Sequence, residues 1–126
     1  MYVCAWSVVN ISAIPAAHNL FRDMDTYLTP PWKDVVDMAI QLLITHQDPK
    51  AARRAALSMK LPAVSRKALE SLFVDPITLA VGYPQIKNGQ HRVEAMKQQK
   101  VDYTLARVDH YVGAMGMGWE IVVEDY

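Results

Sequence analysis

The sequence predicts an α+β fold, namely one compact domain over residues 1–126 with a small mixed sheet and several helices. Two observations on the pattern of residues predict it. Short runs rich in β-branched and aromatic residues occur near both ends of the chain. Between them lies a long segment with the apolar spacing of helices. A chain of 126 residues that is 52% hydrophobic can bury one core, and it leaves no room for a second domain of ordinary size.

The N-terminal segment is predicted to be a buried strand over Tyr2 to Val9, because it is rich in Val, Trp and Tyr. Residues 1–17 are apolar, but they lack the basic start of a signal peptide, and Asn10 interrupts them. No stretch is long enough to span a bilayer. Cys4 is the one cysteine, so an internal disulfide is excluded, and we expect a small core residue in a cytoplasmic protein.

Three helices are predicted in the middle of the chain. Thr29 can cap the first, which is apolar over a wide arc between residues 35 and 44. Asp48, followed by proline, starts a second helix that ends near residue 59. Ser65 can cap a third helix that runs to about residue 73, and Asp75–Pro76 then ends the helical region.

The segment from Asp75 to Asp109 is predicted to contain strand, strand, helix and strand. Residues 77–81 form a short apolar run, residues 83–87 resemble a second one, and Asn88–Gly89 is a strong turn pair. Apolar residues at helical spacing follow, up to the positive turn that ends at Lys100. Residues 103–108 alternate as a strand does.

The turn before this helix is a candidate anion site. A helix that begins directly after Gly89 presents backbone N–H groups and the positive end of its dipole. Arg92 can add a planar charge for two phosphate oxygens, and His91 can donate a hydrogen bond or exchange a proton. Glu94 is a candidate base, although an acid in the first turn also stabilises a helix without any catalytic role. The alternative is a sharp loop with a solvated arginine and a packed histidine.

The same stretch resembles the ParB/sulfiredoxin-like superfamily between about Ser65 and Asp109. ParB-type domains carry a helix, a Pro-Ile-x-Val strand, a Gly-x-x-Arg turn, a helix with an inner alanine and a closing strand. The matching parts here are residues 68–72, Pro76 to Val81, Gly89 to Arg92, Ala95 and residues 103–108. The sulfiredoxin motif Gly-Cys-His-Arg, followed by a Gln-Gln pair, is matched by Gly89, His91, Arg92, Gln98 and Gln99.

Gln90 stands where sulfiredoxins have their cysteine. An amide cannot replace a thiolate nucleophile, so the sequence argues against sulfinic acid reductase activity. The resemblance implies that phosphates bind at Gly89, Gln90, His91 and Arg92. It also implies a nucleotide such as CTP or ATP with Mg²⁺, and some members of the superfamily are nucleases. If the chain hydrolyses such a ligand, His91 or Glu94 would handle the proton and Arg92 would stabilise charge.

A second candidate site is a run of basic residues without any acid. Such a patch attracts nucleic-acid phosphates in a salt-dependent manner. A solvated face of two helices explains the run equally well. Acidic and basic residues balance at 13 each, so any contact with a polyanion must come from a local patch. The run consists of Lys50, Arg53, Arg54, Lys60, Arg66 and Lys67.

Residues 57–66 also resemble the turn of bacterial helix-turn-helix repressors. That interpretation places Ser65, Arg66 and Lys67 at a major groove. The match is incomplete, because Lys60 occupies the usual place of a capping serine and Arg54 that of an alanine.

The remaining polar groups give weaker signals. The four histidines lack metal-ligand spacing, so no metal site is predicted from them. Asp23 and Asp25 could hold Mg²⁺ beside a triphosphate, but paired loop aspartates are more often merely solvated. Gly113 to Gly118 is interpreted as a flap or hairpin loop that closes on a nucleotide or contacts a protein partner.

Two functional hypotheses follow from these observations. The first is a nucleotide- or nucleic-acid-phosphate-binding domain, with NTPase or nuclease activity as an open extension. The second is a non-catalytic phage- or plasmid-type factor that grips DNA through the basic helices 50–67 or binds a protein. No membrane partner is expected under either.

Overall fold

The computed structural model describes residues 2–14, 20, 23–80 and 85–111, and it confirms an α+β fold with a small mixed sheet and several helices. The predicted strands and helices occur in the expected order, and the structure adds two short elements that the sequence analysis did not predict, η1 and α1. No helix of the described ranges is long and apolar enough to cross a membrane. The elements are β1 (Tyr2–Asn10), the 3-10 turn η1 (Ile11–Ala13), α1 (Asp25–Leu28), α2 (Trp32–His46), α3 (Pro49–Ser58), α4 (Ala63–Val74), β2 (Thr78–Ala80), β3 (Gln85–Asn88), α5 (Gln90–Gln98) and β4 (Tyr103–Tyr111).

The four strands form one mixed sheet in the order β1-β4-β2-β3. β1 is antiparallel to β4 along its whole length, from Tyr2 opposite Tyr111 to Asn10 opposite Tyr103. β4 is parallel to β2, and β2 is antiparallel to β3. Parallel neighbours need a crossover connection, which β3 and α5 supply between β2 and β4. This crossover brings the start of α5 close to the end of α4.

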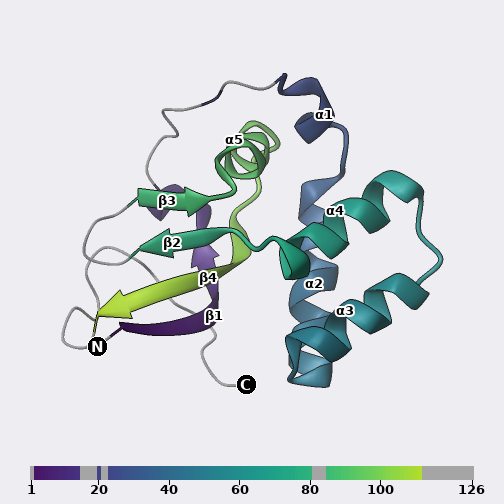
Figure 1. The fold of residues 1–126 in the computed structure, drawn as a ribbon. Helices are drawn as coiled ribbons and strands as arrows, with labels where there is room; N and C mark the ends of the chain where they lie inside the picture. Colours follow the sequence, from purple (N-terminus) through teal and green to yellow (C-terminus); the bar gives the residue numbers. More distant parts are fainter. Residues whose placement is uncertain (1, 15–19, 21–22, 81–84, 112–126) are drawn as a thin grey trace.

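The helices α2, α3 and α4 pack on one another beside the sheet, as Figure 1 shows, while α5 follows β3 and contacts α1. Two contacts tie the helices to the strands. The Trp6 ring of β1 lies 6.0 Å from the Phe73 ring of α4, centroid to centroid. The Tyr103 hydroxyl of β4 donates a 2.7 Å hydrogen bond to Asp37 of α2. One core cluster therefore joins both layers, and Leu69 and Leu105 belong to it.

The helix starts differ from two of the sequence-based expectations. Asp48 caps α3 as predicted, since its side chain accepts from the backbone N–H of Lys50. Thr29 and Ser65, in contrast, do not cap α2 and α4. The N-cap residues are instead Pro31 for α2 and Pro62 for α4, and neither provides a side-chain cap. The proline ring fixes φ near the value that a helix start needs, which a serine or threonine does not do. α4 consequently begins at Ala63, and Ser65 is buried within it.

Candidate functional site

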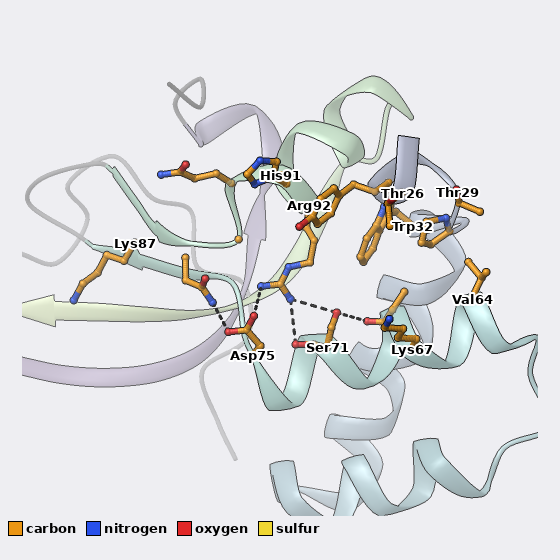
Figure 2. Close-up of a pocket in the computed structure, with 16 residues that line it drawn as sticks. Thr26, Thr29, Trp32, Val64, Lys67, Ser71, Asp75, Lys87, His91 and Arg92 are labelled. Carbon is orange, nitrogen blue, oxygen red and sulfur yellow. Dashed lines mark hydrogen bonds and ion pairs between the residues drawn. The ribbon is translucent and has the colours of Figure 1, made fainter. Parts of the chain in front are cut away.

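A cleft of about 670 Å³ opens where α1, α4 and the turn between β3 and α5 meet. Figure 2 shows the side chains that line it. The turn contributes all four residues of the predicted anion site, Gly89 to Arg92. Lys67 comes from α4 and Lys87 from the end of β3. The fold thus brings the predicted anion site together with two further cations inside one concave surface.

Gly89 shapes the turn at the floor of this cleft. Its backbone is left-handed, with φ of 96°, which is costly for any residue that carries a Cβ. A Cβ at this position would lie 2.7 Å from Cγ1 of Ile77 and 3.2 Å from Nη2 of Arg92. Both the conformation and the close packing therefore require glycine. The sequence signal Asn88–Gly89 identified this turn correctly.

The first turn of α5 presents backbone amides at the cleft. The first intrahelical hydrogen bond runs from the N–H of Val93 to the carbonyl of Gly89, at 3.0 Å. The amides of residues 90–92 come before that bond in the helix, and Gly89 has no side chain with which to cap them. The positive end of the dipole of this nine-residue helix lies at the same place. An anion with several oxygens matches this arrangement of donors.

Arg92 is buried and links α5 to α4, with 6% of the residue exposed. Its Nη1 donates to the backbone carbonyl of Ser71 at 3.1 Å and to the Ser71 hydroxyl at 3.3 Å. Nη2 lies 3.9 Å from a carboxylate oxygen of Asp75. Burial lowers the pKa of Arg92 from its ordinary value, and the charge of Asp75 opposes that shift. A guanidinium nevertheless stays protonated, so Arg92 adds a fixed positive charge to the cleft wall.

The turn is held against the end of α4 by a second pair of contacts. Asn88 donates from Nδ2 to a carboxylate oxygen of Asp75 at 2.7 Å and to the carbonyl of Pro76 at 2.9 Å. The Asp75 side chain is 72% exposed and lines the cleft. Asp75 is therefore an acid within a site that otherwise carries positive charge, and it is close enough to be in competition with a bound anion for Arg92.

His91 stacks on Tyr27 of α1, with ring centroids 4.9 Å apart and an angle of 25° between the planes. The histidine is 9% exposed, and both rings line the cleft. This stacking fixes the imidazole at the wall. His91 is therefore packed against a neighbouring ring, as the alternative interpretation of the turn expected, and it also lines the cleft of the predicted anion site.

Gln99 anchors the opposite wall, which the segment from α1 to α2 forms. Its side-chain Nε2 donates to the carbonyls of Leu28 at 2.9 Å and Pro30 at 2.8 Å, and its Oε1 accepts from the backbone N–H of Trp32 at 3.0 Å. The Trp32 indole in turn donates to the carbonyl of Tyr27. The Gln99 amide thus donates two hydrogen bonds and accepts one, and together they hold residues 28–32 against the C-terminal end of α5. The second glutamine of the pair in the resemblance has a structural task here.

Glu94 and most of the basic run lie elsewhere. Among the described residues that line the cleft, Glu94 is missing, and its carboxylate accepts a 3.3 Å hydrogen bond from Gln98. The six basic residues of the run are all exposed on α3, α4 and their connection, and Lys67 is the member that reaches the cleft. Arg53 forms a 3.1 Å ion pair with Glu70.

Ser65 does not fit the helix-turn-helix interpretation. It is only 7% exposed on α4, so it is not available to a major groove. Its burial follows from its place on the inner side of α4, at helical spacing from the buried Ala68, Leu69 and Leu72.

The remaining sequence candidates divide into two groups. Within the described part of the chain, no cluster of three or more potential metal ligands occurs, and Asp23 instead accepts from the backbone N–H of Asp25 at 3.0 Å. The side chain of Cys4 and the Gly113–Gly118 segment lie outside the described residues.

Sequence reasoning missed several residues of the cleft. Tyr27, Ser71 and Asp75 come from elements that only the tertiary fold brings to the turn. Lys87 directly precedes the Asn88–Gly89 turn, and this position is the signal that could have identified it as a site residue. Lys67 was singled out as part of the basic run, without the link to the turn.

Comparisons of this chain with protein-family models, with curated proteins and with solved structures find no match.

Proposed function

We propose that this domain binds the phosphate groups of a nucleotide in the cleft at the start of α5. The observation that carries the proposal is the convergence of Lys67, Lys87 and Arg92 around one cavity with the start of α5, where Gly89 provides no side-chain cap. The cavity volume of about 670 Å³ lies within the range of small-molecule sites. The resemblance of the Gly89–Arg92 turn to the ParB/sulfiredoxin-like superfamily points to the same ligand class, with CTP or ATP and Mg²⁺ as the first candidates.

The residues have distinct tasks in this proposal. The amides of residues 90–92 donate to phosphate oxygens along the axis of α5. Lys67 and Lys87 are exposed and add positive charges to the cleft from α4 and from the end of β3. Arg92 contributes its positive field from within the wall, because its Nη1 is already engaged by Ser71. Asp75 makes the cleft selective for highly charged anions, because the negative charge of its carboxylate repels any bound anion.

Hydrolysis of the ligand is a separate extension of the proposal. A thiol nucleophile is missing from this turn, because position 90 is a glutamine. His91 is the better placed of the two predicted proton-handling residues, because it lines the cleft, whereas Glu94 does not. Release of inorganic phosphate that disappears in His91→Gln, with nucleotide binding retained, would support a catalytic role.

The test is calorimetric titration of the protein with CTP, ATP and GTP, with and without Mg²⁺. The informative variant is Lys67→Gln, because this exposed side chain lines the cleft. Within the described residues no hydrogen bond of the Lys67 side chain to the rest of the protein is seen, so its loss should not affect folding. Arg92→Ala is less suitable, since it also removes the Ser71 anchor. The matched control is Lys100→Gln, which removes an exposed cation at the end of α5 opposite Gly89.

We expect one nucleotide to bind and Lys67→Gln to weaken it about tenfold, in line with a charge-assisted hydrogen bond of about 1.5 kcal/mol. Lys100→Gln should bind as the wild type does. A folded wild-type protein that gives no binding heat with any nucleotide would refute the proposed function. Equal weakening by Lys67→Gln and Lys100→Gln would show attraction to overall charge and refute the assigned cleft.

A further inference from the structure

The exposed basic side chains of α3 and α4 form a surface that adjoins the cleft. Between residues 49 and 74 the chain has a single acidic residue, Glu70, and this residue is paired with Arg53 at 3.1 Å. Lys50, Arg54 and Lys60 are exposed, and no ion pair is described for any of them. The surface therefore keeps most of its positive charge.

The helical spacing arranges these charges in order. On α3, residues 50, 53, 54 and 57 lie on the exposed side, opposite the buried Ala52 and Ala56. On α4, Arg66 and Glu70 are four residues apart and share one side, which contacts α3 through the Arg53–Glu70 pair. Charge thus continues from α3 across to α4.

The next side of α4 belongs to the cleft. Val64, Lys67, Ser71 and Asp75 follow one another at three- or four-residue spacing, and all of them line the cavity. Lys67 is therefore a member of both features, since it extends the basic surface and lines the phosphate site. In Figure 2 it lies on the same helix as Ser71, the residue that receives Arg92.

We infer that the ligand is a terminal phosphate of a nucleic-acid strand, whose following backbone phosphates run from Lys67 over Arg66 to Lys50 and Arg54. This inference rests on the proposed phosphate site and extends it from a free nucleotide to a polymer. A cavity of about 670 Å³ admits an end nucleotide and not a duplex, so the partner is single-stranded at that end. Successive backbone phosphates on a row of cations give binding that depends on salt rather than on sequence.

The experiment measures the fluorescence anisotropy of a 5′-phosphorylated oligothymidylate of about ten nucleotides, with an oligouridylate of the same length as the RNA arm. Calorimetry with thymidine monophosphate gives the affinity of the cleft alone. Four proteins are compared: the wild type, Lys67→Gln, the double variant Lys50→Gln with Arg54→Gln, and Lys100→Gln. None of these substitutions removes a buried side chain, so each variant should fold.

We expect the strand to bind at least about tenfold more tightly than the monophosphate at low salt. The double variant should lose about tenfold in strand affinity, keep its affinity for the monophosphate, and show a log–log salt slope smaller by about 1.4. Lys67→Gln should weaken both ligands, and Lys100→Gln neither.

Failure of the inference is distinguishable from failure of the proposed function. If the monophosphate binds but neither strand binds more tightly, the proposed phosphate site is supported and the inferred binding of a strand along α3 and α4 is refuted. Wild-type affinity of the double variant for the strands would refute that inference as well. If no mononucleotide binds and Lys67→Gln leaves the affinity for the strands unchanged, the proposed phosphate site itself is refuted, and with it the inferred strand binding that starts there.

Discussion

Replacement of Gln99 by alanine should destabilise the protein through the loss of a wall of the cleft. The wild-type side chain makes three hydrogen bonds of 2.8 to 3.0 Å, two to the carbonyls of Leu28 and Pro30 and one from the backbone N–H of Trp32. At about 1 kcal/mol for each bond, the free energy of unfolding should fall by about 3 kcal/mol. Partly buried backbone groups left without partners act in the same direction.

Gln98→Ala is a matched control from the neighbouring position. Gln98 is exposed and makes a single 3.3 Å hydrogen bond to Glu94, so its loss should cost less than about 0.5 kcal/mol. Urea unfolding followed by circular dichroism measures both variants, and the slope with denaturant should be unchanged. If Gln99→Ala and Gln98→Ala are equally stable, the anchoring role of Gln99 is refuted.

Three further predictions concern the turn and a surface pair. Gly89→Ala should lower the free energy of unfolding by about 2 kcal/mol or more, because φ is 96° and the new Cβ overlaps with its neighbours; thermal unfolding at the wild-type melting point would contradict this. Arg92→Ala should cost about 3 kcal/mol, since it removes a buried side chain bonded to α4, and Arg92→Lys should restore only part of that stability in urea titrations. The hydrogen bond between Tyr103 and Asp37 lowers the pKa of Asp37 from 3.8 and raises the pKa of Tyr103 from 10.0. Its stabilisation, below about 1 kcal/mol at this exposed site, should therefore be lost as the pH falls through the lowered pKa of Asp37 and as it rises through the raised pKa of Tyr103. The difference in unfolding free energy between the wild type and Tyr103→Phe, measured from pH 2 to 12, should shrink at both ends, and a difference independent of pH would exclude this assignment.

The local signals in the sequence determined the four strands, the four longer helices and the turn, but not the short elements η1 and α1. Alternation and β-branched residues placed the strands at both ends, and the Asp48–Pro49 start of α3 was predicted because capping is a property of neighbouring residues. Gly89 was identified for the same reason, since its backbone angle is required by the turn that contains it. Thr29 and Ser65 were wrong as caps, because a serine or threonine near a helix start signals a cap only if the backbone enters the helix at that residue.

The environment of the turn was decided by the tertiary structure. The sequence presented Arg92 as a charge available to a ligand, yet Ser71 from α4 takes one of its nitrogens and the protein interior surrounds it. Tyr27 stacks on His91 across more than sixty positions of the chain, and Gln99 holds the segment that carries this tyrosine. These contacts depend on the crossover between parallel strands, which places the start of α5 beside the end of α4. The chemistry of the turn is thus local to the four residues from Gly89 to Arg92, whereas its burial, its neighbours and its cavity arise from long-range packing that no local pattern encodes.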